Sequence, residues 1–343
     1  MEDSQTVEDI ALETPVSDVF IPPSIDEKAL LAGDSYSYFS PVPPSLLPPP
    51  SETSTTPSET PATGTPVCLG VDEAGRGPVL GPMVYGVFYL PIPLSDPLLR
   101  ETHHFDDSKV LTPAVRSRLM EAVCKPGSDL YESCGFATRS LSARDISTGM
   151  LRPGATYNLN AQAMDATVDL IKGVFAQGVN IAEIYVDTVG QPAAYQAKLQ
   201  RFFPATKITV AKKADSLYPC VSAASVAAKV TRDAALEVLY RARAPEAAET
   251  EEGMAWGSGY PSDQRCVSWM RGNMHPVFGW GPECRFSWGT AKDMLEAKGN
   301  LKVDWPVDDD GEARMTDFFT SADKEDGDEL GTWFGRPAGL EAF

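Results

Sequence analysis

Residues 182–213, AEIYVDTVGQPAAYQAKLQRFFPATKITVAKK, decide the predicted fold because two short apolar runs flank a segment with helical spacing. The runs AEIYVDTV (182–189) and KITVAKK (207–213) have the length and β-branched content of buried strands, and residues 192–203 predict the helix between them. A strand, a helix and a strand in this order form a parallel crossover unit. A long alanine-rich helix is predicted next, over 219–243. The stretch therefore predicts an α/β fold.

The sequence before this unit adds antiparallel strands. VCLGVDEAG (67–75) begins as an apolar run and ends in glycine, and GPMVYGVFYLPI (81–92) follows at once, so the two predict a hairpin. LYESCGFATRS (130–140) predicts a third strand, and residues 158–177 carry apolar side chains at helical spacing. Parallel and antiparallel strands together predict a mixed sheet with helices packed on it.

The acidity of the chain lies at its two ends. The formal net charge is −19, yet residues 66–300 carry 25 acidic and 24 basic side chains. Residues 1–65 are acidic and rich in Pro, Ser and Thr, which predicts a disordered extension, and 301–343 predict an acidic, largely flexible tail. Helical pieces predicted over 261–272 and 287–297 extend the core at its C-terminal side. A nearly neutral core can still carry a basic groove for nucleic acid.

Several classes of protein are excluded by composition. The six cysteines form no C-x-x-C pair and there are three histidines, so a Cys/His zinc site is not expected. The start, MEDSQTVEDIALETP, has no apolar segment typical of a secretory signal, and no run of about 18 apolar residues occurs. We expect a soluble intracellular protein with reduced cysteines.

Four acidic side chains lie at the ends of predicted strands. Asp72 and Glu73 close the first strand, Asp187 closes IYVDTV, and Asp215 follows KITVAKKA. The carboxyl ends of parallel strands are where ligands bind, and carboxylates that converge there repel one another unless cations neutralise them. Hard oxygen ligands suit Mg²⁺ or Mn²⁺, and such a set is what two-metal phosphodiester hydrolysis needs. The pattern predicts a catalytic site for two divalent ions.

Each acid also has a structural alternative. Asp215 precedes the helix predicted from Tyr218–Pro219 and is a candidate N-terminal cap, and the other acids are candidate surface carboxylates. Neighbouring strand residues point to opposite faces, so Asp72 and Glu73 can share a metal only if the following AGRG kinks the strand.

The glycine turn Gly75-Arg76-Gly77 admits two interpretations. Its glycines let the backbone approach a phosphate or sugar, with Arg76 free to pair with a phosphate. The alternative is a tight hairpin turn with a solvated arginine. A dinucleotide-binding fingerprint is excluded because the glycines precede a strand and not a helix.

Basic and aromatic residues near the acids suggest a nucleic-acid surface. Lys229 and Arg232 are three residues apart on one predicted helix and share a face, and Lys109 lies in Asp107-Ser108-Lys109. An ordinary charged helix face is the alternative. Tyr260, on the glycine loop 257–261, can stack on a sugar or base or hydrogen-bond a 2′-hydroxyl, or simply anchor the loop.

Taken together, these motifs are recognisable. GVDEAGRGPVLGPMVYG, DDSKVLT, YVDTVG, KKADSLYPCVSAASVAAKV and GSGYPSD resemble, in order, segments of the type 2 ribonuclease H family, and HPVFGWGPECRFSW resembles its eukaryotic catalytic (A) subunit. The match runs from about residue 66 to 297. The resemblance implies a ribonuclease H-like fold, with a mixed five-stranded sheet flanked by helices and a C-terminal helical extension.

The resemblance also assigns roles to residues. The family's metal-binding catalytic acids fall on Asp72, Glu73, Asp187 and Asp215. Its motif that recognises the 2′-hydroxyl at an RNA–DNA junction falls on Gly75, Arg76 and Gly77. Its junction tyrosine, which stacks on the deoxyribose after the junction, falls on Tyr260, and its substrate-contacting basic positions fall on Lys109 and Arg232.

The function that the resemblance implies is an endoribonuclease acting on RNA–DNA hybrids and 5′ to single ribonucleotides in duplex DNA. It implies a nuclear heterotrimer with two accessory subunits, active in DNA replication and in ribonucleotide excision repair. Two alternatives stay open: another two-metal DNA nuclease, and an inactive hybrid-binding or scaffold subunit. Residues 312–319 resemble a sliding-clamp-binding box, but the favoured interpretation is an apolar segment that docks on this chain or on an accessory subunit.

Overall fold

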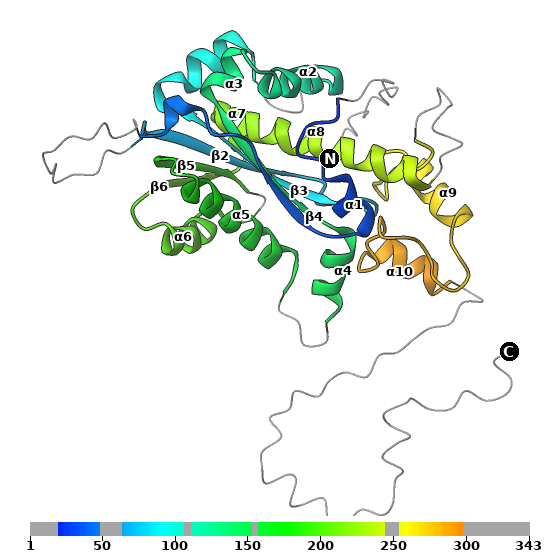
Figure 1. Ribbon diagram of the computed structural model, residues 1–343. Helices are drawn as coiled ribbons and strands as arrows, with labels where there is room; N and C mark the ends of the chain where they lie inside the picture. The colour runs from blue at the N-terminus through cyan, green and yellow to red at the C-terminus, as the bar shows by residue number, and fades with distance from the viewer. Residues whose placement is uncertain are drawn as a thin grey trace, which may run out of the picture. The chain divides into compact units, whose positions relative to one another are not determined.

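The strands of the chain form one mixed sheet. The structure is a computed structural model, which describes residues 20–48, 64–105, 111–152, 157–188, 190–243 and 254–297. Within these ranges the strand order is β1-β4-β3-β2-β5-β6 (Figure 1). β5 pairs in parallel with β2 and β6, and the other neighbours pair antiparallel. The strands are β1 (Tyr36–Phe39), β2 (Val67–Ala74), β3 (Met83–Pro91), β4 (Gly135–Leu141), β5 (Ile181–Asp187) and β6 (Lys207–Ala211).

Helices connect and cover these strands. None of the helices in the described ranges combines the length and the apolar character that crossing a membrane requires. The helices are α1 (Glu27–Ala32), α2 (Pro113–Cys124), α3 (Asp129–Ser133), α4 (Ala143–Leu151), α5 (Leu159–Ala176), α6 (Pro192–Phe202), α7 (Ala214–Leu217), α8 (Pro219–Arg243), α9 (Gln264–Gly272) and α10 (Gly289–Leu295).

The sheet separates two helical layers. α5 and α6 lie on one face, and α8 and α2 lie on the other (Figure 1). On the first face Leu170 of α5 packs with Leu69 of β2 in a buried core. On the second face Val221 of α8 and Met120 of α2 pack with Phe88 of β3. Apolar side chains on both faces of β2 explain why its sequence is a continuous apolar run and not an alternating one.

Helix α8 lies directly against the central strands. A Cβ atom on Gly70 would stand 2.3 Å from the backbone of Cys220, and one on Gly86 would stand 2.6 Å from the carbonyl oxygen of Ala224. The two glycines therefore permit a close approach that no other residue allows. Because Asp72 lies two residues beyond Gly70 on the same face of β2, this approach sets the distance from Asp72 to the helix.

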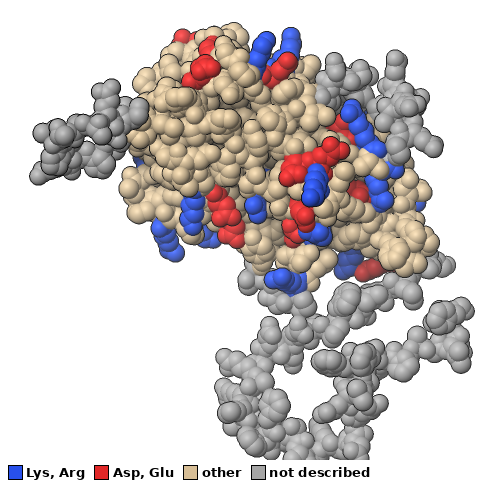
Figure 2. All heavy atoms as spheres, viewed as in Figure 1, with Lys and Arg blue, Asp and Glu red and all other residues tan. Residues whose placement is uncertain are grey.

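The surface carries both signs of charge. On the face drawn in Figure 2, acidic and basic side chains of the described residues lie interspersed among uncharged ones. This distribution agrees with the near balance of acids and bases in residues 66–300.

The N-terminal segment corrects the sequence prediction. Disorder was predicted over 1–65, but within it residues 20–48 are folded, and β1 makes the sheet six-stranded by pairing with the edge strand β4. Leu46 is fully buried in the core on the α5 side, and the hydroxyl groups of Ser24 and Thr231 of α8 lie 2.8 Å apart. The average composition of the segment hides these few apolar residues, whose partners lie far away in the sequence.

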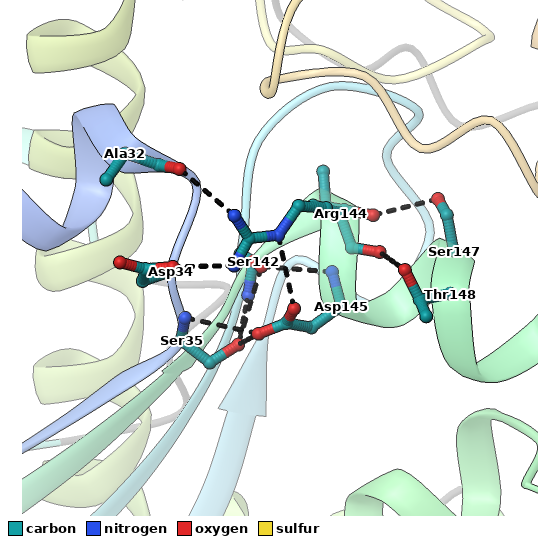
Figure 3. Close-up of polar contacts among 9 residues, drawn as sticks. Ala32, Asp34, Ser35, Ser142, Arg144, Asp145, Ser147 and Thr148 are labelled. Atoms are coloured by element: carbon teal, nitrogen blue, oxygen red, sulfur yellow. Dashed lines mark hydrogen bonds and ion pairs between the residues drawn. The ribbon is translucent and has the colours of Figure 1, made fainter.

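Polar contacts fasten this segment to the start of α4 (Figure 3). Arg144 donates to a carboxylate oxygen of Asp34 at 2.6 Å and to the carbonyl oxygen of Ala32 at 3.2 Å. The Ser35 hydroxyl donates to Asp145 at 2.5 Å, while the Ser142 hydroxyl caps α4 by accepting from the Asp145 amide. These ion pairs are exposed, so buried apolar contacts contribute more than they do to holding the segment.

Most predicted elements agree with the structure. The helix predicted over 158–177 is α5, which begins after Asn158, and the helical pieces predicted over 261–272 and 287–297 contain α9 and α10. The strand predicted over 130–140 begins only at Gly135, because α3 occupies the residues before it. Lys109 and residues 301–343, with the segment 312–319, lie outside the described residues.

Candidate active site

Two of the four predicted acids end neighbouring parallel strands. Val71 of β2 pairs with Val186 of β5, so Asp72 and Asp187 come next at the same edge of the sheet. The side chains of Val71 and Val186 pack on the α5 side, and the alternation of a strand therefore directs Asp72 and Asp187 toward α8. Ser225 of α8 is fully buried close to the Asp72 carboxylate. The predicted juxtaposition of these two acids is present.

Glu73 lies on the opposite face of β2. The strand stays paired with β3 through Ala74, so the kink expected at AGRG does not begin until Gly75. The Glu73 carboxylate lies 4.0 Å from the Arg76 guanidinium. Asp72 and Glu73 thus flank the edge of the sheet from its two sides, and a ligand shared by both has to sit at that edge.

Asp215 is placed by a tight turn after β6. Lys213 adopts a left-handed conformation with φ 56°, and the next amide, of Ala214, donates to the Asp187 carboxylate at 2.8 Å. Asp215 follows directly and is 9% exposed. It lies within α7, four residues before the first residue of α8, Pro219, so it is not the N-terminal cap of α8. The turn brings Asp215 to the strand end that carries Asp187.

Burial and repulsion make Asp72 and Glu73 weak acids. Burial, the Glu73 charge and the Asp187 charge raise the pKa of Asp72 to about 8, although the nearby Ser225 side chain lowers it. Burial and Asp187 likewise raise the pKa of Glu73 to about 7, against the lowering by Arg76. Asp187 therefore acts on both neighbours. Such a set of hard oxygen donors fits a divalent cation, which would remove the repulsion.

The acid oxygens do not form a closed cage. Within the described ranges, no three His, Cys, Asp or Glu side chains are gathered in a way that could hold a metal ion. This agrees with the placement of Asp72 and Glu73 on opposite faces of a regular strand. The structure brings the acids to one edge of the sheet and leaves their oxygens apart.

The raised pKa values predict how the metal-free protein responds to pH. Protonation of Asp72 and Glu73 stabilises the fold fully below their ordinary pKa values of 3.8 and 4.5, and this stability is lost as the pH rises through about 7 and 8. Asp72→Asn removes the part of this pH-dependent loss of stability that Asp72 causes. In EDTA, scanning fluorimetry should show the variant melting about 3–6 °C above the wild type near pH 9 and close to it near pH 5.

A matched control is Asp169→Asn, which changes an exposed aspartate on α5. Its melting temperature should follow that of the wild type at both pH values. If Asp72→Asn also followed the wild type, Asp72 would not lie in a buried acidic cluster.

The glycine turn contacts the two substrate-binding candidates from distant parts of the chain. Gly75 has φ 77°, and a Cβ atom there would stand 2.6 Å from the Arg232 side chain. A Cβ atom on Gly77 would stand 3.2 Å from the Tyr260 ring. Arg76 donates to the side chain of Asn160, at the start of α5. The turn, Arg232 and Tyr260 therefore form one group that directly follows the acids of β2.

Arg232 is placed differently from the sequence expectation. It was expected to share an exposed helix face with Lys229, but it is 6% exposed. Its guanidinium donates to the carbonyl oxygen of Ser258 at 2.8 Å and lies 5.5 Å from the centroid of the Tyr260 ring. The tyrosine is 37% exposed. Arg232 thus supports the tyrosine loop, a role that helical periodicity cannot indicate because the partners are distant in sequence.

Sequence reasoning missed two further residues at the turn. Arg285 and Trp288 donate hydrogen bonds to backbone oxygens of Gly75, Arg76 and Gly77. Both lie in HPVFGWGPECRFSW, about 210 residues after the turn, and no local pattern relates the two segments.

Comparison with known proteins identifies relatives of the chain. The family model of ribonuclease HII matches residues 69–291. The A subunit of ribonuclease H2 from Neurospora crassa is 62% identical over 330 residues, covering 94% of this chain and 97% of the relative. The A subunit of ribonuclease H2 from Homo sapiens is 42% identical over 258 residues, covering 74% of this chain and 82% of the relative.

Solved structures share the fold. Ribonuclease H2 from Pyrococcus horikoshii matches with a TM-score of 0.53 at 28% identity, covering 66% of this chain and 96% of that one. Ribonuclease HII from Archaeoglobus fulgidus, solved as a complex with PCNA, matches with a TM-score of 0.52 at 24% identity, covering 66% and 96%. The family match spans most of the described core, including the acids, the glycine turn and Tyr260. The chain therefore belongs to the ribonuclease HII family, among the eukaryotic ribonuclease H2 catalytic (A) subunits, and is a ribonuclease H.

Proposed function

We propose that this ribonuclease H cuts the RNA strand of RNA–DNA hybrids and cuts 5′ to a single ribonucleotide embedded in duplex DNA, leaving 5′-phosphate and 3′-hydroxyl ends. The observation that carries the proposal is the continuity of β2 with the glycine turn. Asp72 and Glu73 lie near the end of the strand, and Gly75 to Gly77 follow at once, against Tyr260. Buried acids thus adjoin a backbone that a ribose can approach closely.

Carboxylate oxygens are the donors that Mg²⁺ and Mn²⁺ prefer, so two such ions suit the chemistry of this site. Asp72, Glu73, Asp187 and Asp215 would hold them. Burial and repulsion raise the pKa of Asp72 and Glu73. The site is therefore more stable with a bound cation or with protonated carboxyl groups than with charged carboxylates that nothing neutralises. When bound, the ions supply an activated water and stabilise the leaving oxygen.

The chain's own groups orient these ligands. The Ala214 amide holds one oxygen of Asp187. The Glu73 amide holds one oxygen of Asp72 at 2.7 Å. Fixed carboxylates reduce the reorganisation that catalysis requires.

Recognition of the ribose falls to the turn. Its backbone N–H groups would donate to the 2′-hydroxyl, which DNA lacks. Tyr260 would stack on the deoxyribose after the junction, which places the cut 5′ to the last ribonucleotide. The Tyr260 ring lies against Gly77, which supports recognition of the ribose by the turn and of the next deoxyribose by the tyrosine at the same time.

Two alternatives are weaker on specific grounds. An inactive hybrid-binding or scaffold subunit has no need for four acids at one sheet edge, since uncompensated buried charge destabilises a fold. Another two-metal DNA nuclease has no 2′-hydroxyl for the glycine turn to read. Each alternative predicts a different outcome in a cleavage assay.

Partners and location form part of the same proposal. The relatives are named as A subunits, and we place this chain in a nuclear heterotrimer with two accessory subunits that acts in replication and ribonucleotide excision repair. A sliding clamp would bind through residues 312–319, which lie outside the described residues. An archaeal ribonuclease HII has been solved with PCNA, and this supports testing the contact.

Cleavage of a duplex with one ribonucleotide tests the function. The chain alone and the chain in its complex are assayed on this duplex, on an all-RNA hybrid and on an all-DNA duplex, with Mg²⁺ or EDTA. A metal-dependent cut 5′ to the ribonucleotide, with a 3′-hydroxyl that a polymerase extends, is expected. Cutting of the all-DNA duplex would favour the DNA nuclease, and binding without cutting would favour the scaffold.

A further inference from the structure

The carbonyl groups of the glycine turn are all bound from one distant segment. Arg285 donates through Nη2 to the Gly75 oxygen at 2.6 Å and through Nη1 to the Arg76 oxygen at 3.1 Å. The Trp288 indole donates to the Gly77 oxygen at 2.9 Å. Each of the three carbonyls of the motif therefore has a side-chain donor from the short segment that precedes α10.

Arg285 is itself firmly held. Its side chain is fully buried, and its Nε donates to the Gly81 oxygen at 3.0 Å. Its backbone amide donates to the Val79 oxygen at 2.9 Å, and its guanidinium lies 4.8 Å from the centroid of the Trp288 ring. A planar fork with several fixed donors matches several carbonyls at once in a way that a lysine cannot. Arg285 and Trp288 thus form one rigid support beneath the turn.

Burying the charged guanidinium of Arg285 costs desolvation free energy, so packing alone does not explain why an arginine lies here. Burial, together with the nearby Arg232, lowers the pKa of Arg285 to about 9. The group still carries its charge at neutral pH, so the fold keeps a desolvated cation at this position. A buried cation whose side-chain hydrogen bonds go to backbone oxygens indicates that the orientation of those oxygens matters.

Fixing the Gly75 and Arg76 carbonyls also fixes two amides, while the Trp288 hydrogen bond fixes the Gly77–Pro78 peptide unit at which the turn ends. In a trans peptide unit the C=O and the following N–H point in opposite directions. With the Gly75 and Arg76 oxygens turned toward Arg285, the amides of Arg76 and Gly77 face away from it. Within the described part of the chain, no backbone oxygen accepts a hydrogen bond from either amide. Pro78 follows and has no N–H, so these two amides are the donors that the turn can present.

We infer that Arg285 and Trp288 are positioning residues for ribose recognition, which hold the turn's carbonyls so that the Arg76 and Gly77 amides point at the 2′-hydroxyl. The inference rests on the proposed reading of ribose by this turn. It assigns a part in specificity to residues about 210 positions away, whose hydrogen bonds go to the backbone of the turn.

Trp288→Phe is the sharpest test, because it keeps an aromatic ring beside Arg285 and removes the N–H bonded to Gly77. Its control is Trp280→Phe, which removes an indole hydrogen bond of 2.8 Å to the Met270 oxygen, away from the turn. Binding of the full chain is measured with Ca²⁺ in place of a catalytic ion, on a duplex with one ribonucleotide and on the matched all-DNA duplex. The readout is the ratio of the two affinities.

The expected result is a ratio about tenfold lower in Trp288→Phe, as one misaligned hydrogen bond predicts, and an unchanged ratio in Trp280→Phe. Hydrogen exchange at the turn should quicken in the first variant only. A wild-type ratio in Trp288→Phe, or equal losses on both duplexes, would overturn the inference. A wild-type protein with no preference between the duplexes would instead refute the proposed function of the turn, and the inference with it.

Arg285→Lys provides a second test of the inference. It keeps the charge and loses the fork, so the ratio should fall more than in Trp288→Phe. Added guanidinium should partly restore the ratio in Arg285→Ala but not in Trp288→Phe, provided that both variants melt cooperatively. If Arg285→Lys kept the wild-type ratio of the two affinities, Arg285 would not be a positioning residue for the turn.

Discussion

Replacing Asp187 with asparagine should abolish nearly all cleavage while leaving the fold intact. Asparagine still accepts the hydrogen bond from the Ala214 amide, which now holds Asp187 at 2.8 Å. It cannot supply the negative charge that a divalent ion requires. A lost metal ligand costs several kcal/mol of transition-state stabilisation, so turnover should fall by about 10³-fold or more. Single-turnover cleavage of an RNA–DNA hybrid in Mg²⁺ measures the effect.

The control is Asp169→Asn on the outer face of α5, which should keep wild-type turnover. The melting temperature of Asp187→Asn in EDTA should match or exceed that of the wild type, because a repulsive charge has been removed. Activity within about tenfold of the wild type would contradict the metal assignment of Asp187.

Replacing Tyr260 with alanine should impair cleavage at single ribonucleotides far more than cleavage of continuous RNA–DNA hybrids. Only the former substrate has to be read at a junction between ribose and deoxyribose. Stacking of one aromatic ring contributes about 1–3 kcal/mol, so the loss at single ribonucleotides should be about tenfold to a hundredfold. Comparison of kcat/KM on the two substrates measures it.

Tyr260→Phe separates the two roles that the sequence left open. If the ring stacks on the sugar, the phenylalanine variant should keep nearly all activity, whereas a hydrogen bond from the hydroxyl to a 2′-hydroxyl would make it as poor as alanine. Arg232, whose guanidinium lies 5.5 Å from the ring centroid, can contact either ring. Equal losses of Tyr260→Ala on both substrates would exclude a junction-specific role.

The central features of the fold were predictable because they follow from local patterns. The apolar run before Asp72 and the strand–helix–strand alternation of residues 182–213 each depend on neighbouring residues alone. Parallel pairing of β5 with β6 follows from the alternation. Pairing of β2 with β5, which places Asp72 and Asp187 together, joins segments that are distant in sequence. The acids at strand ends predicted a metal site from the sequence pattern, and the resemblance assigned the individual metal-binding and ribose-reading roles, which stay predictions.

The features that were missed depend on contacts between distant residues. β1 forms because Tyr36 and its neighbours pair with β4, about a hundred positions later, and composition gives no sign of that partner. Arg232 looks like a surface residue in its helix but is covered by the loop of Ser258 and Tyr260. Arg285 carries a charge and was not expected in a core. Its partners are backbone oxygens, which no sequence pattern marks.

We expect Asp72, Glu73, Asp187 and Asp215 to share a pair of divalent ions beside the glycine turn. The anomalous signal of Mn²⁺ in crystals of the protein bound to a duplex that holds one ribonucleotide tests this arrangement. Two peaks about 3.5–4 Å apart are expected, with Asp72 contacting both. A single peak that Asp72 does not contact, or no peak at this edge of the sheet, would contradict it.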